Sequence, residues 1–276
     1  MLPHTFMHIQ GIGPKTEARL WQDGLTTWDD LYKQSPKLYS PARARYIRTC
    51  LDESRINQDT PSAMSALLPT SQHWRLFPHF RERTVYLDIE TTGLGEFADI
   101  TTIALYDGTS IRWYINGDNL DDFPRDINDS KVIVTYNGKS FDIPVIERFF
   151  NMKLPQTQLD LRHILRQLGY SGGLKGCEQK LGLNRGELSG FDGSLAVILW
   201  HTYRRTGDQR ALATLLAYNI LDTVNLEILM VEAYNRNVAK TPFAESLTLP
   251  PPISPTLPFV ADHDLLETIR RQHFRW

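Results

Sequence analysis

The sequence predicts an α/β protein with a mixed sheet flanked by helices, preceded by a small helical domain. Three observations lead to this prediction. Residues 85–90 alternate between apolar and polar side chains, which is the two-residue period of a strand. Apolar runs on both sides of Asp107-Gly108 predict a β-hairpin. Residues 212–234 carry apolar side chains at helical spacing, so long helices accompany the strands.

The amino-terminal residues 6–32 predict two short helices around glycine turns. Pro14 suits the first position of a helix, and Thr27 suits a helix cap because an acid follows three residues later. Residues 36–57 continue as a further helix that carries four arginines. We therefore expect the chain to begin with a small helical domain.

The first glycine turn resembles a known DNA-binding motif. Gly11 and Gly13 enclose one apolar residue and are followed by Pro14 and Lys15, which is similar to a helix-hairpin-helix. The resemblance implies that backbone N–H groups at the two glycines, with Lys15, contact a DNA phosphate. A hairpin that serves only packing is the alternative.

Composition predicts where the domains meet. Residues 57–69 are rich in Asp, Thr, Pro and Ser, which is typical of a linker or a loosely packed connection. The expected organisation is a helical domain at 1–58, a linker at 59–79, an α/β domain at 80–238, and a Pro-rich tail with a short helix at 239–276.

The first strand of the α/β domain carries two acids. Its alternation places Asp88 and Glu90 on one face, beyond which comes a Thr-Thr-Gly turn. Carboxylates are hard oxygen ligands suited to Mg²⁺ or Mn²⁺, and a pair at the end of a strand can hold one ion or bridge two. We therefore predict a metal site, the alternative being an edge strand whose polar face is solvated.

Further strands follow in chain order. Residues 100–106 and 110–115 form the two arms of the hairpin, so the first three strands are expected to make an antiparallel meander. Residues 132–136 form a fourth strand, and a fifth short strand ends near residues 159–161. The remainder is expected to be mainly helical.

Two more acids lie on predicted helices. Ser140 is a plausible cap, which puts Asp142 in the first turn of a helix, where an acid can simply complement the helix dipole. Tyr218 and Asp222 are four residues apart, so both lie on one face of the long carboxy-terminal helix.

Together these residues resemble the three exonuclease motifs of the DEDD, or DnaQ-like, superfamily, in its tyrosine subgroup. Residues 87–94 resemble the first motif, residues 136–142 the second, and residues 218–222 the third. The resemblance implies a ribonuclease H-like fold. With the amino-terminal hairpin, the chain is also similar to the YprB-like family of ribonuclease H-related nucleases.

The resemblance implies a metal-dependent 3′ to 5′ exonuclease that uses two divalent ions, Mg²⁺ or Mn²⁺. In such an enzyme Asp88 would bridge both ions. Glu90 and Asp222 would complete the site that activates water, and Asp142 would hold the second ion. Tyr218 would orient the attacking water or help to deprotonate it.

Candidate substrate-binding residues lie in and around the motifs. They are Thr91 in the first motif, Asn137 and Lys139 in the second-motif turn, and Lys175 after a glycine-rich helix start. Asn137 equally suits a turn, and Lys175 can lie on a solvated helix face. Asp160 either supports the metal site or caps a helix.

Composition excludes several classes of protein. A formal charge of −2 gives no global basic excess, so a nucleic-acid surface has to be local. The only two cysteines, Cys50 and Cys177, cannot form a disulfide framework or a zinc site. The chain shows no signal segment and no apolar run of roughly 18 residues, so we expect a cytoplasmic protein without a membrane partner.

The expected partner is nucleic acid. Single-stranded DNA is favoured because hairpins of this kind mostly meet DNA phosphates, and RNA remains possible because the motifs do not read the sugar. The alternatives are an RNA-directed or structure-selective nuclease, and a catalytically silent DNA-binding protein that keeps the fold.

Overall fold

The computed structural model describes residues 1–95 and 98–273. The chain divides into two compact units. Unit 1 comprises Met1–Glu82 and Val231–Pro250, and unit 2 comprises Arg83–Met230 and Pro251–Trp276. The long helix α11 (Gln209–Val238) contributes residues to both units.

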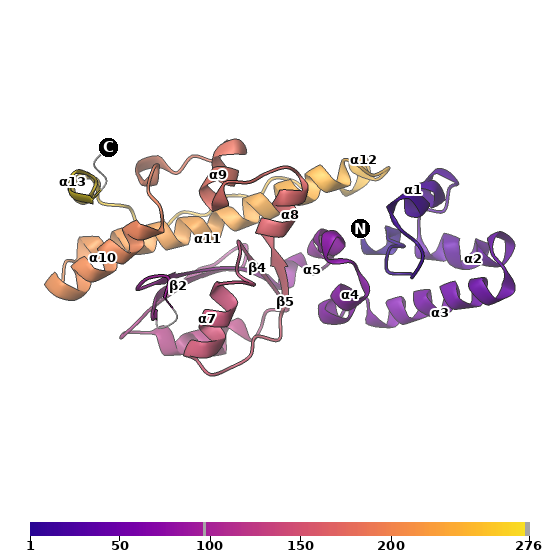
Figure 1. The fold of residues 1–276 in the computed structure, drawn as a ribbon, viewed down its shortest axis with the longest axis horizontal. Helices are drawn as coiled ribbons and strands as arrows, with labels where there is room; N and C mark the ends of the chain where they lie inside the picture. Colours follow the sequence, from indigo (N-terminus) through magenta and orange to yellow (C-terminus); the bar gives the residue numbers. More distant parts are fainter. Residues whose placement is uncertain (96–97, 274–276) are drawn as a thin grey trace. The chain divides into compact units, whose positions relative to one another are not determined.

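Unit 2 contains the five-stranded sheet (Figure 1). Its order is β3-β2-β1-β4-β5. β1 is antiparallel to β2 and β2 to β3, whereas β4 runs parallel to β1 and β5 parallel to β4. The strands are β1 (Thr84–Thr91), β2 (Ile100–Tyr106), β3 (Ile111–Ile115), β4 (Val132–Thr135) and β5 (Thr157–Asp160). The predicted α/β class with a meander followed by parallel strands is confirmed.

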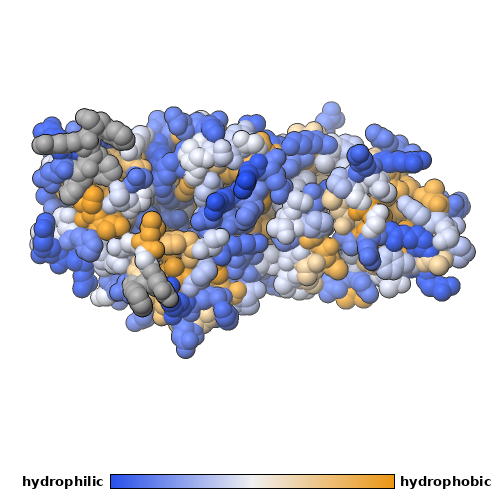
Figure 2. Space-filling view, in the orientation of Figure 1, coloured by the Kyte–Doolittle hydropathy of each residue, from blue (hydrophilic) through white to orange (hydrophobic). Residues whose placement is uncertain are grey.

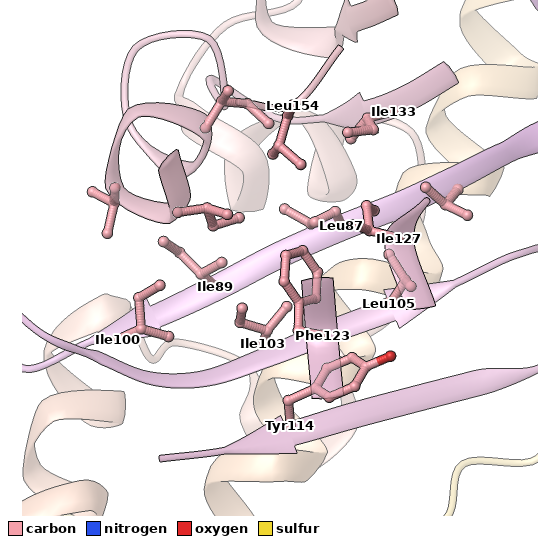
Figure 3. Close-up of a cluster of buried hydrophobic side chains, with 14 of the residues drawn as sticks. Leu87, Ile89, Ile100, Ile103, Leu105, Tyr114, Phe123, Ile127, Ile133 and Leu154 are labelled. Carbon is pink, nitrogen blue, oxygen red and sulfur yellow. The ribbon is translucent and has the colours of Figure 1, made fainter. Parts of the chain in front are cut away.

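Alternation along β1 gives the sheet two different faces. Leu87 and Ile89 point into an apolar cluster with Phe123 and Ile146, which lie on α6 (Phe123–Ile127) and α7 (Asp142–Phe149) (Figure 3). The acids Asp88 and Glu90 point to the other face, which is the face that α11 covers (Figure 1). The face of the molecule drawn in Figure 2 is mainly hydrophilic, with apolar side chains in small separate groups.

The other helices of unit 2 are α8 (Leu161–Gln167), α9 (Gly173–Lys180), α10 (Gly193–Thr206) and α13 (His263–His273). α11 is long and apolar enough to cross a membrane, with a mean hydropathy of 1.3 over its most apolar 18 residues. That window is 89% buried inside the fold, so packing accounts for its apolar side chains.

Unit 1 begins with the helices predicted from the glycine turns. They are α1 (Pro14–Gln22), α2 (Trp28–Leu38) and α3 (Pro41–Asn57). Pro14 occupies the first turn of α1 as expected. Thr27 and Asp30 form the predicted capping box, in which the Asp30 N–H donates to Thr27 Oγ1 and the Thr27 N–H donates to Asp30 Oδ2 at 2.9 Å.

The helix-hairpin-helix resemblance is incomplete. The only helix before Gly11 in this part of the chain is the 3₁₀ helix η1 (Leu2–His4), and residues 7–11 form turns. Gly11 itself has φ 85°, a left-handed conformation that interrupts a helix. The hairpin turn and the helix after it are present, whereas the expected first helix is absent.

The expectation of a loosely packed linker at 59–79 is wrong. This stretch folds as α4 (Pro61–Leu67), the 3₁₀ helix η2 (Thr70–Leu76) and α5 (Phe77–Phe80). The Trp74 ring packs 5.7 Å from the Tyr234 ring, and Arg75 forms a buried ion pair with Glu17 of α1 at 2.7 Å. These contacts fold the segment into unit 1.

The tail expected at 239–276 contains two short helices, α12 (Ala244–Leu247) and α13, separated by extended Pro-rich chain. Phe259 of that extended chain packs edge-on against Trp113, with ring centroids 5.0 Å apart. Leu266 and Ile269 of α13 are buried. Arg275, which the sequence places at the end of the tail, lies outside the described residues.

Candidate metal and nucleic-acid site

Three carboxylates from two elements meet at one point. β1 supplies Asp88 and Glu90 from its sheet face toward α11, and α11 supplies Asp222. One oxygen of each carboxylate lies within 4.8 Å of the others. Since the strand period is two residues and the helix packs across that face, the sequence brings these three acids together through simple periodicity.

Asp142 lies near this group without being part of it. It is the first residue of α7, and the helix cap is Phe141, so Ser140 is not the cap that the sequence suggested. Asp142 Oδ1 accepts a hydrogen bond from the Ile89 N–H at 3.2 Å, which ties the start of α7 to β1 between the two other acids. All four acids line one cavity.

That cavity has a volume of about 610 Å³. Besides the four acids, its lining includes Thr91, Asn137, Lys175, Asp192 and Tyr218. A cavity of this size can hold a small-molecule ligand, and its lining of five carboxylates, a lysine and aromatic rings can also hold cations.

Burial and mutual repulsion disfavour the charged form of the acids. Burial, followed by the charges of Glu90 and Asp222, raises the pKa of Asp88 well above its usual range. Burial, followed by the charge of Asp222, raises the pKa of Glu90 to about 8. Burial raises the pKa of Asp142 to about 7. A bound cation would remove this cost, because it lets all the carboxylates ionise together.

Two cations hold Asp222. Lys175 pairs with one carboxylate oxygen and Arg185 with the other, the latter at 2.5 Å. Arg185 also pairs with Glu178 at 2.8 Å, and Glu178 accepts a hydrogen bond from Asn225 at 2.7 Å. Burial is the largest single influence on Lys175 and lowers its pKa. The charge and hydrogen bond of Asp222, together with the charge of Asp88, outweigh burial, so the pKa of Lys175 is raised.

Sequence reasoning missed Arg185 and Glu178. Arg185 lies between α9 and α10 beside a 3₁₀ turn, where apolar periodicity gives no signal, and 37 residues separate it from Asp222. Its side chain is only 6% exposed. A buried arginine held by two carboxylates fixes the position of Asp222 on the helix.

Tyr218 is fully buried on α11, one turn before Asp222. Among the described residues, its hydroxyl has no hydrogen-bond partner although it lines the cavity. The Lys175 ammonium lies 4.6 Å from the centre of its ring, and the Arg185 guanidinium lies 5.4 Å away. Burial and the charge of Asp222 raise the pKa of Tyr218 far above its usual range.

Asn219 is a third residue to which the sequence analysis gave no role. Its Nδ2 donates to Asp88 Oδ2 at 2.7 Å and to the Asp88 carbonyl at 3.2 Å. Its Oδ1 accepts from the Thr102 hydroxyl at 3.0 Å. A polar side chain beside Tyr218 on an apolar helix was the available signal, and the structure shows that it orients Asp88.

Asp160 organises the second-motif turn and also caps α8. One of its oxygens accepts from the Asn137 N–H at 2.8 Å and from the Arg162 N–H at 3.0 Å. The other accepts from the Lys139 N–H at 3.3 Å. Gly138 is required here because an added Cβ would lie 2.2 Å from Thr135 Oγ1. The helix-cap expectation for Asp160 is confirmed, and its support of a metal site stays a prediction.

The remaining candidates fall into three places. Thr91 and Asn137 line the cavity with Lys175, whereas Lys139 is exposed and outside its lining. Gly11, Gly13 and Lys15 lie in unit 1. There Arg43 donates to the Gln10 carbonyl at 2.6 Å and packs against Gly11, which closes the hairpin turn.

The donor set fits divalent metal ions. Asp88, Glu90 and Asp222 offer hard oxygen atoms close enough to share one ion, and Asp142 extends the set along the cavity. Burial of a negative charge is the main cause of the raised pKa values of Glu90 and Asp142, and a bound cation would offset that cost. The fold thus holds four carboxylates on one cavity, at a cost that a bound cation would lower.

The RNase_H_2 family model, described as the RNase_H superfamily, matches residues 85–234. No curated protein matches the chain. A solved structure, the family B DNA polymerase from the hyperthermophilic archaeon Pyrobaculum calidifontis, is similar with 15% identity and a TM-score of 0.43. That similarity covers 60% of this chain and 27% of the polymerase chain. Because the family model spans more than half of the 276 residues, the chain belongs to the RNase H superfamily.

Proposed function

We propose that this protein is a metal-dependent nuclease that removes nucleotides from the 3′ end of a nucleic-acid strand, preferentially single-stranded DNA. The observation that carries the proposal is the meeting of Asp88, Glu90 and Asp222 within 4.8 Å on the wall of a cavity. Membership of the RNase H superfamily implies a nucleic-acid substrate. The direction of attack is supported by the order and spacing of the three motifs.

Asp88, Glu90, Asp142 and Asp222 would hold two divalent ions, Mg²⁺ or Mn²⁺. When bound, such ions supply a reactive hydroxide and neutralise charge on the phosphate. The protein's own contribution is to fix the ligands in place. Asn219 orients Asp88, and Arg185 anchors Asp222.

Tyr218 is suited to orient the attacking water. Tyr218 lines the cavity, and its buried hydroxyl has no hydrogen-bond partner among the described residues, which leaves it a hydrogen bond to make to a water or to a phosphate oxygen. Its raised pKa keeps the phenol neutral, which favours orienting the water over removing its proton.

Lys175 is suited to contact the phosphate of the scissile bond. Lys175 lines the cavity, and its ammonium lies beside Asp222 and over the Tyr218 ring. Its side chain is 33% exposed, so a ligand in the cavity can reach it. An ammonium there can stabilise the negative charge that builds up on the phosphate. The cavity volume suits the end of one strand rather than a duplex.

The test is cleavage of end-labelled strands. Single-stranded DNA and RNA of one sequence, labelled at the 5′ end, are incubated with the protein and Mg²⁺ or Mn²⁺. We expect a ladder that shortens stepwise from the 3′ end, faster for DNA, and no products with a chelator. A circular single strand serves as the control, because an exonuclease leaves it intact. Absence of products with either metal would contradict the proposal.

A further inference from the structure

A second cavity adjoins the candidate active site. Its volume is about 570 Å³, and it shares Tyr136 and Asn137 with the first cavity. The rest of its wall comes from α8 and from the loop that leads into α9. Those residues are Arg162, Arg166, Tyr170 and residues 171–173. None of the residues that line it is acidic.

The α8 side of this cavity is strongly basic. Arg162 and Arg166 are four residues apart, so they project from one face of the helix, and both are exposed. Figure 2 shows strongly hydrophilic side chains over the region where Figure 1 draws α8 and α9. Two guanidinium groups without a neighbouring carboxylate in the lining form a site for an anion such as phosphate.

The glycines in the lining let a ligand approach the backbone closely. Gly172 and Gly173 have φ values of 107° and 74°, which glycine adopts readily, and they lead into the first turn of α9. A Cβ added at Gly173 would meet no atom within 4 Å, so space there is open. The N–H groups at the start of α9 add to the attraction that the arginines exert on a phosphate.

Two tyrosines complete the wall. Tyr136 and Tyr170 are half-buried and line the cavity beside the arginines. Base stacking on aromatic rings together with a basic groove is the usual way in which proteins bind a single strand without reading its sequence. The lining therefore carries both kinds of group that a nucleotide requires.

One hydrogen bond links the two cavities. Arg162 Nη1 donates to Asn137 Oδ1 at 2.5 Å, and the backbone at Asn137 is held by Asp160. A strand whose end occupies the first cavity would thus meet the arginines directly beyond the second-motif turn. This adjacency favours a continuing strand over an unrelated anion.

We propose that the second cavity binds the substrate strand away from the scissile bond, with Arg162 and Arg166 on its phosphates and Tyr136 and Tyr170 against its bases. The inference rests on the proposed nuclease function and adds the path of the strand. It makes binding depend on substrate length, because a dinucleotide fills only the first cavity.

The test measures binding of fluorescent single strands of increasing length to full-length Asp88→Asn protein, in which cleavage does not intervene. Arg166→Ala is added to this background because Arg166 lines only the second cavity. An octanucleotide should bind more tightly than a dinucleotide, and we expect Arg166→Ala to reduce this gain in affinity by roughly 10-fold. That is the change expected when one charge-assisted hydrogen bond is lost. The salt slope should fall by about 1.

Arg205→Ala is the matched control, since Arg205 is exposed on α10 of the same unit and lines neither cavity. Tyr170→Ala should weaken octanucleotide binding without changing the salt slope, and Tyr170→Phe should restore it. Thermal melts of every variant verify folding.

Equal length dependence in the Arg166→Ala and Arg205→Ala proteins would overturn the proposal. Competition of a nucleoside 5′-monophosphate for the second cavity, with no effect of strand length, would also overturn it, because the cavity would then hold released product. Failure of the nuclease proposal itself appears separately, as absence of cleavage by the unmutated protein. The binding measurement does not depend on that result.

Discussion

The Tyr218 hydroxyl is buried at the cavity without a hydrogen-bond partner among the described residues. If it orients the attacking water, Tyr218→Phe should slow cleavage by roughly 10² to 10⁴, the range for loss of such a group. Removing one oxygen leaves the ring and its contacts with Lys175 and Arg185, so folding and Mn²⁺ binding should persist. Single-turnover cleavage and Mn²⁺ titration calorimetry measure the two effects. Near-normal cleavage would remove the tyrosine from the mechanism.

Arg185 is a residue whose loss should cost stability as well as activity. Arg185→Gln leaves Glu178 and Asp222 as buried carboxylates without their shared cation, which should lower the free energy of unfolding by about 3–5 kcal/mol. The control is Arg210→Gln, which breaks a solvent-exposed pair with Asp208 and should change the free energy of unfolding little. Urea unfolding measures the free energy of unfolding of both variants. Equal losses would mean that the buried Arg185 pairs stabilise the fold no more than an exposed pair does.

The packing of α11 on β1 places Asp88, Glu90 and Asp222 close together. The stability of the folded protein therefore depends on pH. Glu90 has a pKa of about 8 in the folded protein against 4.5 ordinarily, so folding favours its protonated form. Its stabilising contribution is fully present below pH 4.5 and is lost as pH rises through 8. Burial likewise raises the pKa of Asp142, from 3.8 to about 7. Lys175, whose pKa is raised, stays charged throughout this range.

We therefore expect the metal-free protein to lose stability between about pH 5 and about pH 8.5, and added Mg²⁺ or Mn²⁺ to stabilise it more at the higher pH, where the ligands are deprotonated. Thermal melts over this range, with metal and with a chelator, measure the effect. Glu90→Gln should flatten the metal-free profile. A stabilisation by metal that is larger at the lower pH would be inconsistent with carboxylate ligands.

Elements with a clear period were predictable, and elements defined by distant contacts were not. The strand with Asp88 and Glu90 follows from alternation over a few residues, and the helix with Asp222 follows from its 3.6-residue period. Arg185 joins the site from a loop without a period, through a contact across 37 residues. Local pattern therefore identified Asp88, Glu90 and Asp222 but not the side chains that hold them.

The predicted linker shows why composition misled. Pro61 belongs to the Pro-containing stretch that suggested a linker, yet it occupies the first turn of α4, where proline is favoured, as Pro78 does in α5. The apolar side chains that bury this segment, Trp74 and Phe77, pack on Tyr234, far away in sequence. Composition alone reveals neither the helical position of a proline nor a packing contact with a residue far away in sequence.

At the scale of the whole molecule, unit 1 is proposed to add affinity for DNA through its hairpin. Lys15 is exposed in the first turn of α1, where backbone N–H groups have no partner within the helix and can donate to a phosphate. Lys15→Glu should weaken binding of single-stranded DNA and lower its salt slope by about 1. Lys37→Glu makes the same charge change at an exposed position on α2 and is the control. Matching affinities and slopes for the two variants would leave the hairpin with a packing role only.

The whole account depends on the acids acting as metal ligands in a nuclease, and Asp88 is at their centre. The decisive measurement is the rate at which 3′-labelled nucleotide is released from a single-stranded DNA by Asp88→Asn and by the unmutated protein, at saturating Mn²⁺. The substitution keeps the shape of the side chain and removes the charge that would bridge the ions. The unmutated protein is expected to release nucleotide steadily and the variant to release none; near-normal release by Asp88→Asn would mean that Asp88 is not a metal ligand of a nuclease.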